Sequence, residues 1–379
     1  METNRIELVS PCLFGLEGPL AGELRRMGAA DVRPQNGRVF FAGGPEMIAR
    51  ANLRIRYGER VLVRMGAFPA RSFDELFEGV RALPWERWIG RRDAFPVKGS
   101  CVDSKLASVP DCQSIVKKAI VERLKGKYSV QWFEETGPVR QVQFFLRKDL
   151  ASLMIDTSGA GLHKRGYRPA AAQAPIRETL AAAMAYFSRV RHDAAFYDPC
   201  CGSGTLLIEA ALYALNIAPG LGRRFSAEHW DRLDASVWKR ERESARALEK
   251  RDASFSAKGS DIDPAAVALT LENAARAGVA DRIRAEQRDI ADFREEGERG
   301  CVICNPPYGE RMLDLKSAER IYRTMGRVFR PRRGWSYAVI SPDDSFERCF
   351  GRPASRRRKL YNGMIRCQYH MYFDEAEKP

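Results

Sequence analysis

The fold is decided by the stretch Cys301-Val302-Ile303-Cys304-Asn305-Pro306-Pro307-Tyr308-Gly309. Its first four residues are apolar without alternation, which is typical of a parallel strand that is buried on both faces. Two prolines follow, and proline neither continues a ladder nor lets the preceding residue turn helical. The stretch therefore predicts a buried strand and a rigid loop, with Asn305 at the carboxyl edge of an α/β sheet, where open sheets bind ligands.

The residues after this strand have a specific chemistry. The amide oxygen of Asn305 and the backbone carbonyl of Pro306 can each accept one hydrogen of a planar exocyclic amine, which takes the nitrogen lone pair out of conjugation and directs it at an electrophile. Tyr308 is placed to stack on the ring that carries the amine. The alternative is a loop in which the two prolines only end a strand. The candidate catalytic residues are Asn305, Pro306, Pro307 and Tyr308.

A glycine-bearing turn follows an apolar strand that starts at Ala194. It reads Asp198-Pro-Cys-Cys-Gly202-Ser-Gly204-Thr205 and leads into an alanine-rich helix. The glycines let the backbone approach a ligand closely, and Asp198 can receive a positive group. The third glycine of the dinucleotide fingerprint is absent, and the leading carboxylate suits an ammonium better than a pyrophosphate. S-adenosylmethionine carries such an ammonium and no phosphate, so we expect it as the cofactor.

Two further strands end in acidic residues. The strand 256–260 ends at Asp261, where a carboxylate can accept from ribose hydroxyls, and the strand 283–287 ends near Asp289, which suits the adenine amine. Each acidic strand end alone is also explained as a helix cap. Four polar strand ends in order favour a cofactor cleft. The candidate cofactor-binding residues are Asp198, Cys200, Gly202, Gly204, Thr205, Asp261, Ile262, Asp289, Ile290 and Asn305.

Composition and charge bound the class of protein. The chain has 379 residues, 45% of them hydrophobic, which suits two or three packed domains. Its net charge of +14 indicates a polyanionic partner. Nucleic acid is favoured over an acidic membrane surface, because no basic amphipathic helix of the membrane-binding kind stands out. Neither an apolar run of about 18 residues nor a signal peptide is present, so we expect a cytoplasmic protein.

The nine cysteines follow neither a disulfide pattern nor a metal pattern. Cys301 and Cys304 have a zinc-like spacing, but no second cysteine pair or histidine cluster accompanies them. Two thiols inside an apolar strand are better explained as core residues. We therefore expect no metal.

The first 157 residues indicate a small α+β architecture. Apolar residues recur at helical spacing in several segments, and Ser72 with Glu75 forms a capping signature. We expect helices at 18–27, 45–53, 72–82 and 111–125. We expect strands at 7–14, 38–41, 60–67, 95–101, 129–133, 139–146 and 150–156.

Cations gather in three places. Lysines lie on the helix 111–125 and before it, the connector 162–169 is cationic, and an arginine run begins at residue 356. These side chains can meet phosphates. Lysines on a helix are nevertheless usually a solvated face, and the connector is equally well explained as a plain linker. The candidate nucleic-acid-binding residues are Lys98, Lys105, Lys117, Lys118, Lys164, Arg165, Arg168, Arg356, Arg357 and Arg358.

The second half of the chain alternates strands and helices. An insert at 214–255 separates the first two strands, and we interpret it as a lid or an elaboration on the RNA side. A helix at 264–277, a helix at 318–329 and a strand at 335–340 follow, and an Asn-Gly pair at 362–363 predicts a closing hairpin. This order predicts a mostly parallel sheet that ends in an antiparallel hairpin.

The chain resembles known protein families in two respects. Phe95-Pro-Val-Lys-Gly-Ser-Cys and the segment from Ser104 to Ile120 resemble a THUMP domain, a module of RNA-modifying enzymes. Nearly the whole chain resembles the THUMP-containing class I methyltransferases that make N2-methylguanosine in RNA, most closely those acting on 23S ribosomal RNA. The motifs that carry this second resemblance are Asp198-Pro-Cys-Cys-Gly-Ser-Gly-Thr, Asn216-Ile-Ala-Pro-Gly, Gly259-Ser-Asp-Ile-Asp, Asn305-Pro-Pro-Tyr-Gly-Glu-Arg and Lys359-Leu-Tyr-Asn-Gly.

The resemblance implies a division of the chain and a reaction. It implies a ferredoxin-like domain at 1–60, a THUMP domain at 61–157 and a Rossmann-like methyltransferase domain at 158–379. It implies methyl transfer from S-adenosylmethionine to the N2 amine of a guanosine, with a single activity in this chain. N6-adenine methylation of DNA or RNA, guanine-N2 methylation of transfer RNA, and a non-catalytic RNA-binding role stay open as alternatives. The sequence leaves the oligomeric state open.

Overall fold

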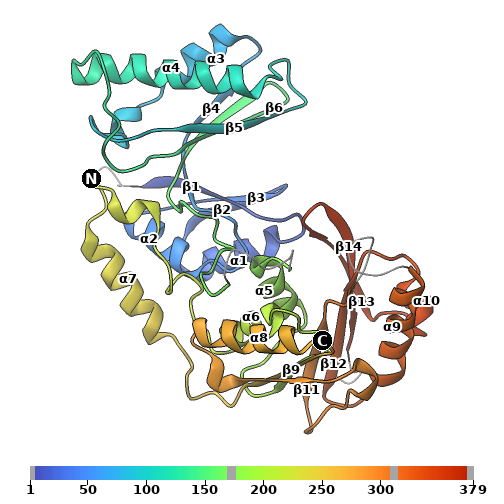
Figure 1. The fold of residues 1–379 in the computed structure, drawn as a ribbon. Helices are drawn as coiled ribbons and strands as arrows, with labels where there is room; N and C mark the ends of the chain where they lie inside the picture. Colours follow the sequence, from blue (N-terminus) through green and yellow to red (C-terminus); the bar gives the residue numbers. More distant parts are fainter. Residues whose placement is uncertain (1–4, 169–175, 308–314, 374–379) are drawn as a thin grey trace.

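The protein contains two seven-stranded sheets, one in each half of the chain (Figure 1). The structure is a computed structural model and describes residues 5–168, 176–307 and 315–373. Within these ranges, no helix has both the length and the apolar character that a membrane crossing requires.

The first sheet joins the two amino-terminal units. Its strand order is β2-β3-β1-β4-β7-β6-β5, and β4 pairs with β1 on one side and β7 on the other. Helices α1 and α2 pack against its β2–β3 end, and α3 and α4 lie over its β4–β5 end (Figure 1). The strands are β1 (Ile6–Pro11), β2 (Ala30–Gln35), β3 (Arg38–Gly43), β4 (Leu62–Pro69), β5 (Val97–Val102), β6 (Val142–Arg147) and β7 (Leu150–Asp156). The helices are α1 (Glu17–Arg26), α2 (Pro45–Arg54), α3 (Phe73–Ala82) and α4 (Val109–Tyr128).

Most expected elements of this half are present. Ser72 caps α3 by accepting from the amide of Glu75, as the capping signature predicts. The strand expected at 129–133 is wrong: α4 runs to Tyr128, Ser129 adopts the left-handed conformation that ends it, and residues 130–133 form a loop. Strand β2 is absent from the sequence-based assignment, because its residues are mostly exposed and show no apolar alternation.

The second sheet has the order β10-β9-β8-β11-β12-β14-β13. Its first five strands are parallel, and β14 and β13 pair antiparallel, so the expected parallel sheet with a closing hairpin is confirmed. The strands are β8 (Ala195–Asp198), β9 (Ser256–Asp261), β10 (Ile283–Gln287), β11 (Gly300–Cys304), β12 (Trp335–Ser341), β13 (Arg356–Asn362) and β14 (Ile365–Tyr372). The helices are α5 (Glu178–Phe187), α6 (Thr205–Ala214), α7 (Ala235–Ala247), α8 (Pro264–Arg276), α9 (Leu315–Val328) and α10 (Phe346–Phe350).

Helices cover both faces of this sheet, which explains the uninterrupted apolar run of β11. Cys301 and Ile303 belong to the core shared with α5 and α6, whereas Val302 and Cys304 belong to a second core with α9 and α10. Figure 1 shows these helix pairs on opposite sides of the strands. Every residue of β11 is buried, as a strand between two helical layers requires.

The insert at 214–255 connects the two halves of the molecule, so our interpretation of it as a lid is corrected, whereas an elaboration on the RNA side stays a prediction. Its helix α7 packs along α2 of the first half (Figure 1). Glu241 is largely buried there and accepts from Arg50 at 2.7 and 3.0 Å, while Arg54 donates to Ser244 at 2.8 Å. The charge of Glu241, which suggests an exposed helix in the sequence, therefore belongs to an ion pair between the two halves of the molecule.

Candidate functional site

The polar strand ends meet at the carboxyl edge of the second sheet. Strand β8 lies inside the sheet: it pairs with β9 on one side and with β11 on the other. Asp198 ends β8, Asp261 ends β9, and Asn305 directly follows β11. The chain order reverses between β8 and β11, and such a switch point is where open α/β sheets bind ligands.

The glycine loop after β8 is built for close approach. Gly202 and Gly204 have φ angles of +53° and +78°, a region that other residues rarely adopt, and Gly204 is the N-cap residue that precedes α6. A Cβ atom on Gly204 would meet Thr270 at 2.8 Å, whereas a Cβ atom on Gly202 would meet nothing within 4 Å. The space above Gly202 is therefore open to a ligand.

Two buried side chains of α8 hold this loop, and the sequence analysis missed both. Thr270 donates to the carbonyl of Gly202 at 2.9 Å, and Asn273 donates to the carbonyl of Ser203 at 2.9 Å. Both are fully buried. Polar residues on the inner face of an amphipathic helix are the only signal of this role in the sequence.

Asp198 is an acidic group held in an apolar environment. It is 1% exposed, and among the described residues it accepts a hydrogen bond only from the amide of Cys200, at 3.2 Å. Burial, with a further contribution from the nearby charge of Asp261, raises the pKa of Asp198 to about 8. A cationic ligand above the strand would lower the pKa of Asp198 again, because an adjacent positive charge favours the carboxylate.

The second acidic strand end organises the loop, and the next residue lines an open cleft. Asp261 accepts from the amides of Gly202 and Asp263 at 3.0 and 3.1 Å. Beside it, Ile262 is 68% exposed, which is unusual for a large apolar side chain. The cleft has a volume of about 700 Å³ and is lined by Ile262, Gln287, Arg288, Asp289, Asp292 and Arg294.

The remaining cofactor candidates have structural contacts. Asp289 accepts from the amide of Ala291 and so caps a short turn, while Ile290 is buried in the core beneath it. Thr205 is buried and receives a hydrogen bond from Arg168 at 3.2 Å. Cys200 is half-buried and packs against the core cluster that contains Cys304.

Asn305 presents an unused acceptor. Its Oδ1 atom is buried and has no hydrogen-bond partner among the residues that the structure describes. Pro306, the next residue, is buried, and Pro307 is half-buried. An unpaired buried amide oxygen is costly, so its presence points to a donor that a ligand supplies. Tyr308 lies outside the described residues.

The structure separates the candidate RNA-binding cations into two groups. Lys117 donates to Glu135 at 2.5 Å and to the carbonyl of Phe95, and Arg357 pairs with Glu347 at 2.5 Å. Six of the ten candidates are exposed and form no ion pair among the described residues. These are Lys98, Lys105, Lys118, Lys164, Arg356 and Arg358.

The prediction that two cations of the connector contact phosphates is corrected, because both side chains are mostly buried. Arg165 is 5% exposed and donates to the carbonyls of Leu162 and Arg56 at 2.7 Å. Arg168 pairs with the buried Glu178 at 2.7 Å. Both guanidinium groups hold the connector against the domains, and only 14% of the Arg168 side chain is exposed. As for a metal, no group of three or more His, Cys, Asp or Glu side chains in the described ranges is arranged to hold one.

Three family models match the chain. The model of the RMKL-like methyltransferase domain matches residues 165–371, that of the RlmL ferredoxin-like domain matches residues 7–62, and that of the THUMP domain matches residues 70–156.

Curated relatives cover the whole chain. It is 43% identical over 376 residues to YpsC of Bacillus subtilis (strain 168), which is named as an RNA methyltransferase, covering 98% of this chain and 97% of the relative. It is 33% identical over 384 residues to the ribosomal RNA large subunit methyltransferase K/L of Psychromonas ingrahamii, covering 97% of this chain. The chain spans 50% of that second relative.

Two solved structures share the fold over their full length. One comes from Listeria monocytogenes and is described as a predicted N6-adenine-specific DNA methylase: it is 44% identical, with a TM-score of 0.93, covering 98% of this chain and 96% of that one. The other is SMU.472, a methyltransferase in complex with SAH: it is 39% identical, with a TM-score of 0.94, covering 99% of this chain and 100% of that one.

Proposed function

We propose, from the premise that this chain belongs to the RMKL-like methyltransferase family, that it methylates the exocyclic N2 amine of a guanosine in large-subunit ribosomal RNA. Membership makes it a methyltransferase of the RNA class that depends on S-adenosylmethionine. The atom and the RNA molecule are our proposal. Ribosomal RNA is suggested by the relative from Psychromonas ingrahamii, and such a substrate would place the enzyme in the cytoplasm.

The observation that carries the proposal is the buried, unpaired Oδ1 of Asn305 at the end of β11. An exocyclic amine has two hydrogens to donate, and Oδ1 takes one of them while the carbonyl of Pro306 takes the other. This pair of bonds holds the nitrogen in place and draws its lone pair out of the ring. Both bonds strengthen as the nitrogen becomes tetrahedral, so they favour the transition state over the bound substrate.

The residues around the loop fit the cofactor. The buried carboxylate of Asp198 would be stabilised by the ammonium group of the cofactor. Gly202 leaves room for the cofactor to approach the backbone closely. In this proposal Asp261 accepts from the ribose, Ile262 packs on the adenine, and Asp289 accepts from the adenine amine. When it is bound, S-adenosylmethionine supplies an electrophilic methyl group. The protein positions the nitrogen and excludes water.

The amino-terminal half supplies RNA affinity in this proposal. We place the ferredoxin-like domain at 1–60 and the THUMP domain at 61–157. Lys98 and Lys118 extend from β5 and α4, and both are exposed. Their charge can be neutralised by phosphates, since neither is used in an ion pair among the described residues.

Adenine N6 is the second candidate for the methylated atom. The solved relative from Listeria monocytogenes carries that description, and an unpaired Asn305 oxygen would accept from an adenine amine equally well. A THUMP domain favours RNA over DNA as the substrate. Transfer RNA is a further alternative for the molecule that carries the guanosine.

One experiment separates these candidates. The purified enzyme is incubated with labelled S-adenosylmethionine and, in parallel, with ribosomal RNA, transfer RNA and DNA lacking the modification. The products are digested to nucleosides and identified by mass spectrometry. N2-methylguanosine in ribosomal RNA supports the proposal, N6-methyladenine moves the assignment to the second candidate, and no product in any arm contradicts an enzymatic role.

A further inference from the structure

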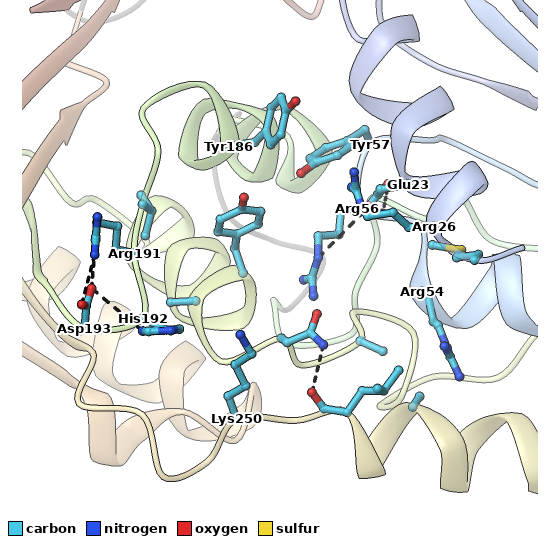
Figure 2. Close-up of a pocket in the computed structure, with 18 residues that line it drawn as sticks. Glu23, Arg26, Arg54, Arg56, Tyr57, Tyr186, Arg191, His192, Asp193 and Lys250 are labelled. Carbon is cyan, nitrogen blue, oxygen red and sulfur yellow. Dashed lines mark hydrogen bonds and ion pairs between the residues drawn. The ribbon is translucent and has the colours of Figure 1, made fainter. Parts of the chain in front are cut away.

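A second pocket lies between the ferredoxin-like and methyltransferase domains (Figure 2). Its volume is about 640 Å³, within the range of small-molecule sites. One wall is formed by α1 and the end of α2, and the other by the ends of α5 and α6 with the segment after α7. The lining residues 190–193 precede β8 and Lys250 precedes β9, so the pocket lies at the amino edge of the second sheet. The glycine loop and Asn305 are at the opposite edge.

The centre of this pocket is a buried arginine without a counter-ion at hydrogen-bond distance. The Arg56 side chain is 8% exposed, and its Nη1 atom has no partner among the described residues. The nearest carboxylate oxygen, on Glu23, is 3.9 Å from its Nε. Glu23 instead accepts from the backbone amide of Arg56 at 3.1 and 3.3 Å. The ion pair between Arg56 and Glu23 is therefore long, and the buried Nη1 group is left without an acceptor that a bound anion could supply.

Further cations surround Arg56. Figure 2 shows Arg26 and Arg54 on the same wall and Lys250 on the facing wall. The charged ends of Arg26 and Lys250 form no hydrogen bond within the part of the chain that the structure describes, and the Nε of Arg54 is buried without a partner. These side chains approach from two domains, so an anion between them would be held from both sides.

The carboxylates of the pocket do not neutralise this charge. Burial raises the pKa of Glu23 to about 7, so part of this group carries a proton at neutral pH. Asp193 is held by Arg191 and Arg299 at 3.0 Å each, at the other end of the pocket. The pocket is therefore positive around Arg56.

Tyr186 and Tyr213 give the same pocket flat apolar surfaces, while the buried Tyr57 packs against Tyr186. The rings of Tyr57 and Tyr186 are 5.7 Å apart, and the guanidinium of Arg56 lies 5.9 Å from the ring of Tyr213. Tyr186 is 37% exposed and so offers a ring face to a ligand. Aromatic faces beside a cationic site are the features that bind a base and its phosphate.

We propose that this pocket binds a nucleotide, with its phosphate on Arg56, Arg26 and Lys250 and its base against Tyr186 or Tyr213. Arginine suits this role because its planar fork matches phosphate oxygens. A free nucleotide and a nucleotide within an RNA chain offer the same chemistry. The inference does not depend on methyl transfer, because the pocket lies at the amino edge of the second sheet and Asn305 lies at its carboxyl edge.

The test uses the full-length protein with guanosine monophosphate, inorganic phosphate and guanosine as probes. Calorimetry should show binding of the monophosphate, weaker binding of phosphate, and the weakest binding of guanosine. Arg56→Gln should weaken monophosphate binding by about ten-fold to a hundred-fold, the loss of one charge-assisted contact. Arg33→Gln is the matched control, because it removes the same charge from an exposed position on β2. It should leave binding unchanged.

Melting temperatures exclude a folding artefact. The monophosphate should raise the melting temperature of the wild type but not that of Arg56→Gln. If Arg56→Gln fails to fold, Arg26→Gln replaces it, since Arg26 is exposed and unpaired among the described residues. That variant should bind the monophosphate about three-fold or more weakly.

Two outcomes overturn the proposal, and a competition arm identifies the source of the nucleotide. The proposal fails if neither the monophosphate nor phosphate binds the wild type at about 10 mM. It also fails if Arg33→Gln and Arg56→Gln lose equal affinity. A short oligoribonucleotide without terminal phosphates that displaces the monophosphate indicates an RNA chain. Failure of that oligonucleotide to compete indicates a free nucleotide.

Discussion

Protonation of Asp198 should couple cofactor binding to pH. Its pKa is about 8, because the carboxyl is fully buried and Asp261 lies nearby. At pH 7 roughly one-tenth of the unliganded protein carries the carboxylate that an ammonium needs. Binding at pH 7 should therefore release nearly one proton. The affinity should rise by about ten-fold from pH 6 to pH 7 and level off near pH 8, where the ligand's α-amino group starts to lose its proton.

The same pKa has a consequence for the unliganded fold. The pKa of Asp198 lies above its ordinary value of 3.8, so ionisation is harder in the folded state than in the unfolded state. The contribution of this group to stability is fully present below about pH 4 and is lost as the pH rises towards 8. Cofactor binding should restore stability in that window.

Calorimetry at pH 7 in phosphate and in Tris measures the proton release, because the apparent enthalpy then depends on the ionisation enthalpy of the buffer. Asp198→Asn should bind more weakly and lose both the buffer dependence and the rise of affinity with pH. Asp111→Asn, which changes an exposed carboxylate at the start of α4, is the control and should behave as the wild type. A wild-type affinity that is flat from pH 6 to 8, with no proton release, would refute the reasoning.

Three further predictions concern a contact between domains, a contact within the glycine loop and the proposed contacts with RNA. Glu241→Ala should lower the free energy of unfolding by about 1.5–3 kcal/mol in urea denaturation, because Arg50 loses its charged partner between the domains; an unchanged midpoint would contradict this. Thr270→Val should weaken cofactor binding by about five-fold in calorimetry, because the glycine loop loses one hydrogen bond of about 1 kcal/mol; unchanged affinity would show that the loop does not need it. Replacing Lys98 and Lys118 together by glutamine should weaken RNA binding and lower the slope of log affinity against log salt concentration by about two. Filter binding measures this slope. A slope equal to that of the wild type would show that neither lysine contacts RNA.

The elements around the carboxyl edge of the second sheet were predictable because their signals are local. A doubly buried strand, a proline pair and acidic residues at strand ends can each be recognised within ten residues of sequence. The topology then brings Asp198, Asp261 and Asn305 to one edge, as the parallel order requires. The unpaired state of the Asn305 oxygen was not predictable, since it depends on every neighbour in space.

The features that the sequence does not predict depend on contacts between residues that are distant in the chain. Arg165 looks like a surface cation in sequence, but its partners include Arg56, 109 residues away. The helix α7 is strongly charged, and only the position of α2 shows that Glu241 is buried. The pocket at Arg56 is likewise formed by two domains and has no local signature.

The central claim is that Asn305 acts on the amine in the transition state. The measurement is the single-turnover rate of methyl transfer at saturating RNA and cofactor, with the product nucleoside identified by mass spectrometry. Asn305→Ala should lower this rate by about 10²–10³, the loss of one preorganised contact, while RNA affinity stays near that of the wild type. The product should be N2-methylguanosine. A wild-type chemical rate in Asn305→Ala, with only weakened RNA binding, would contradict the account.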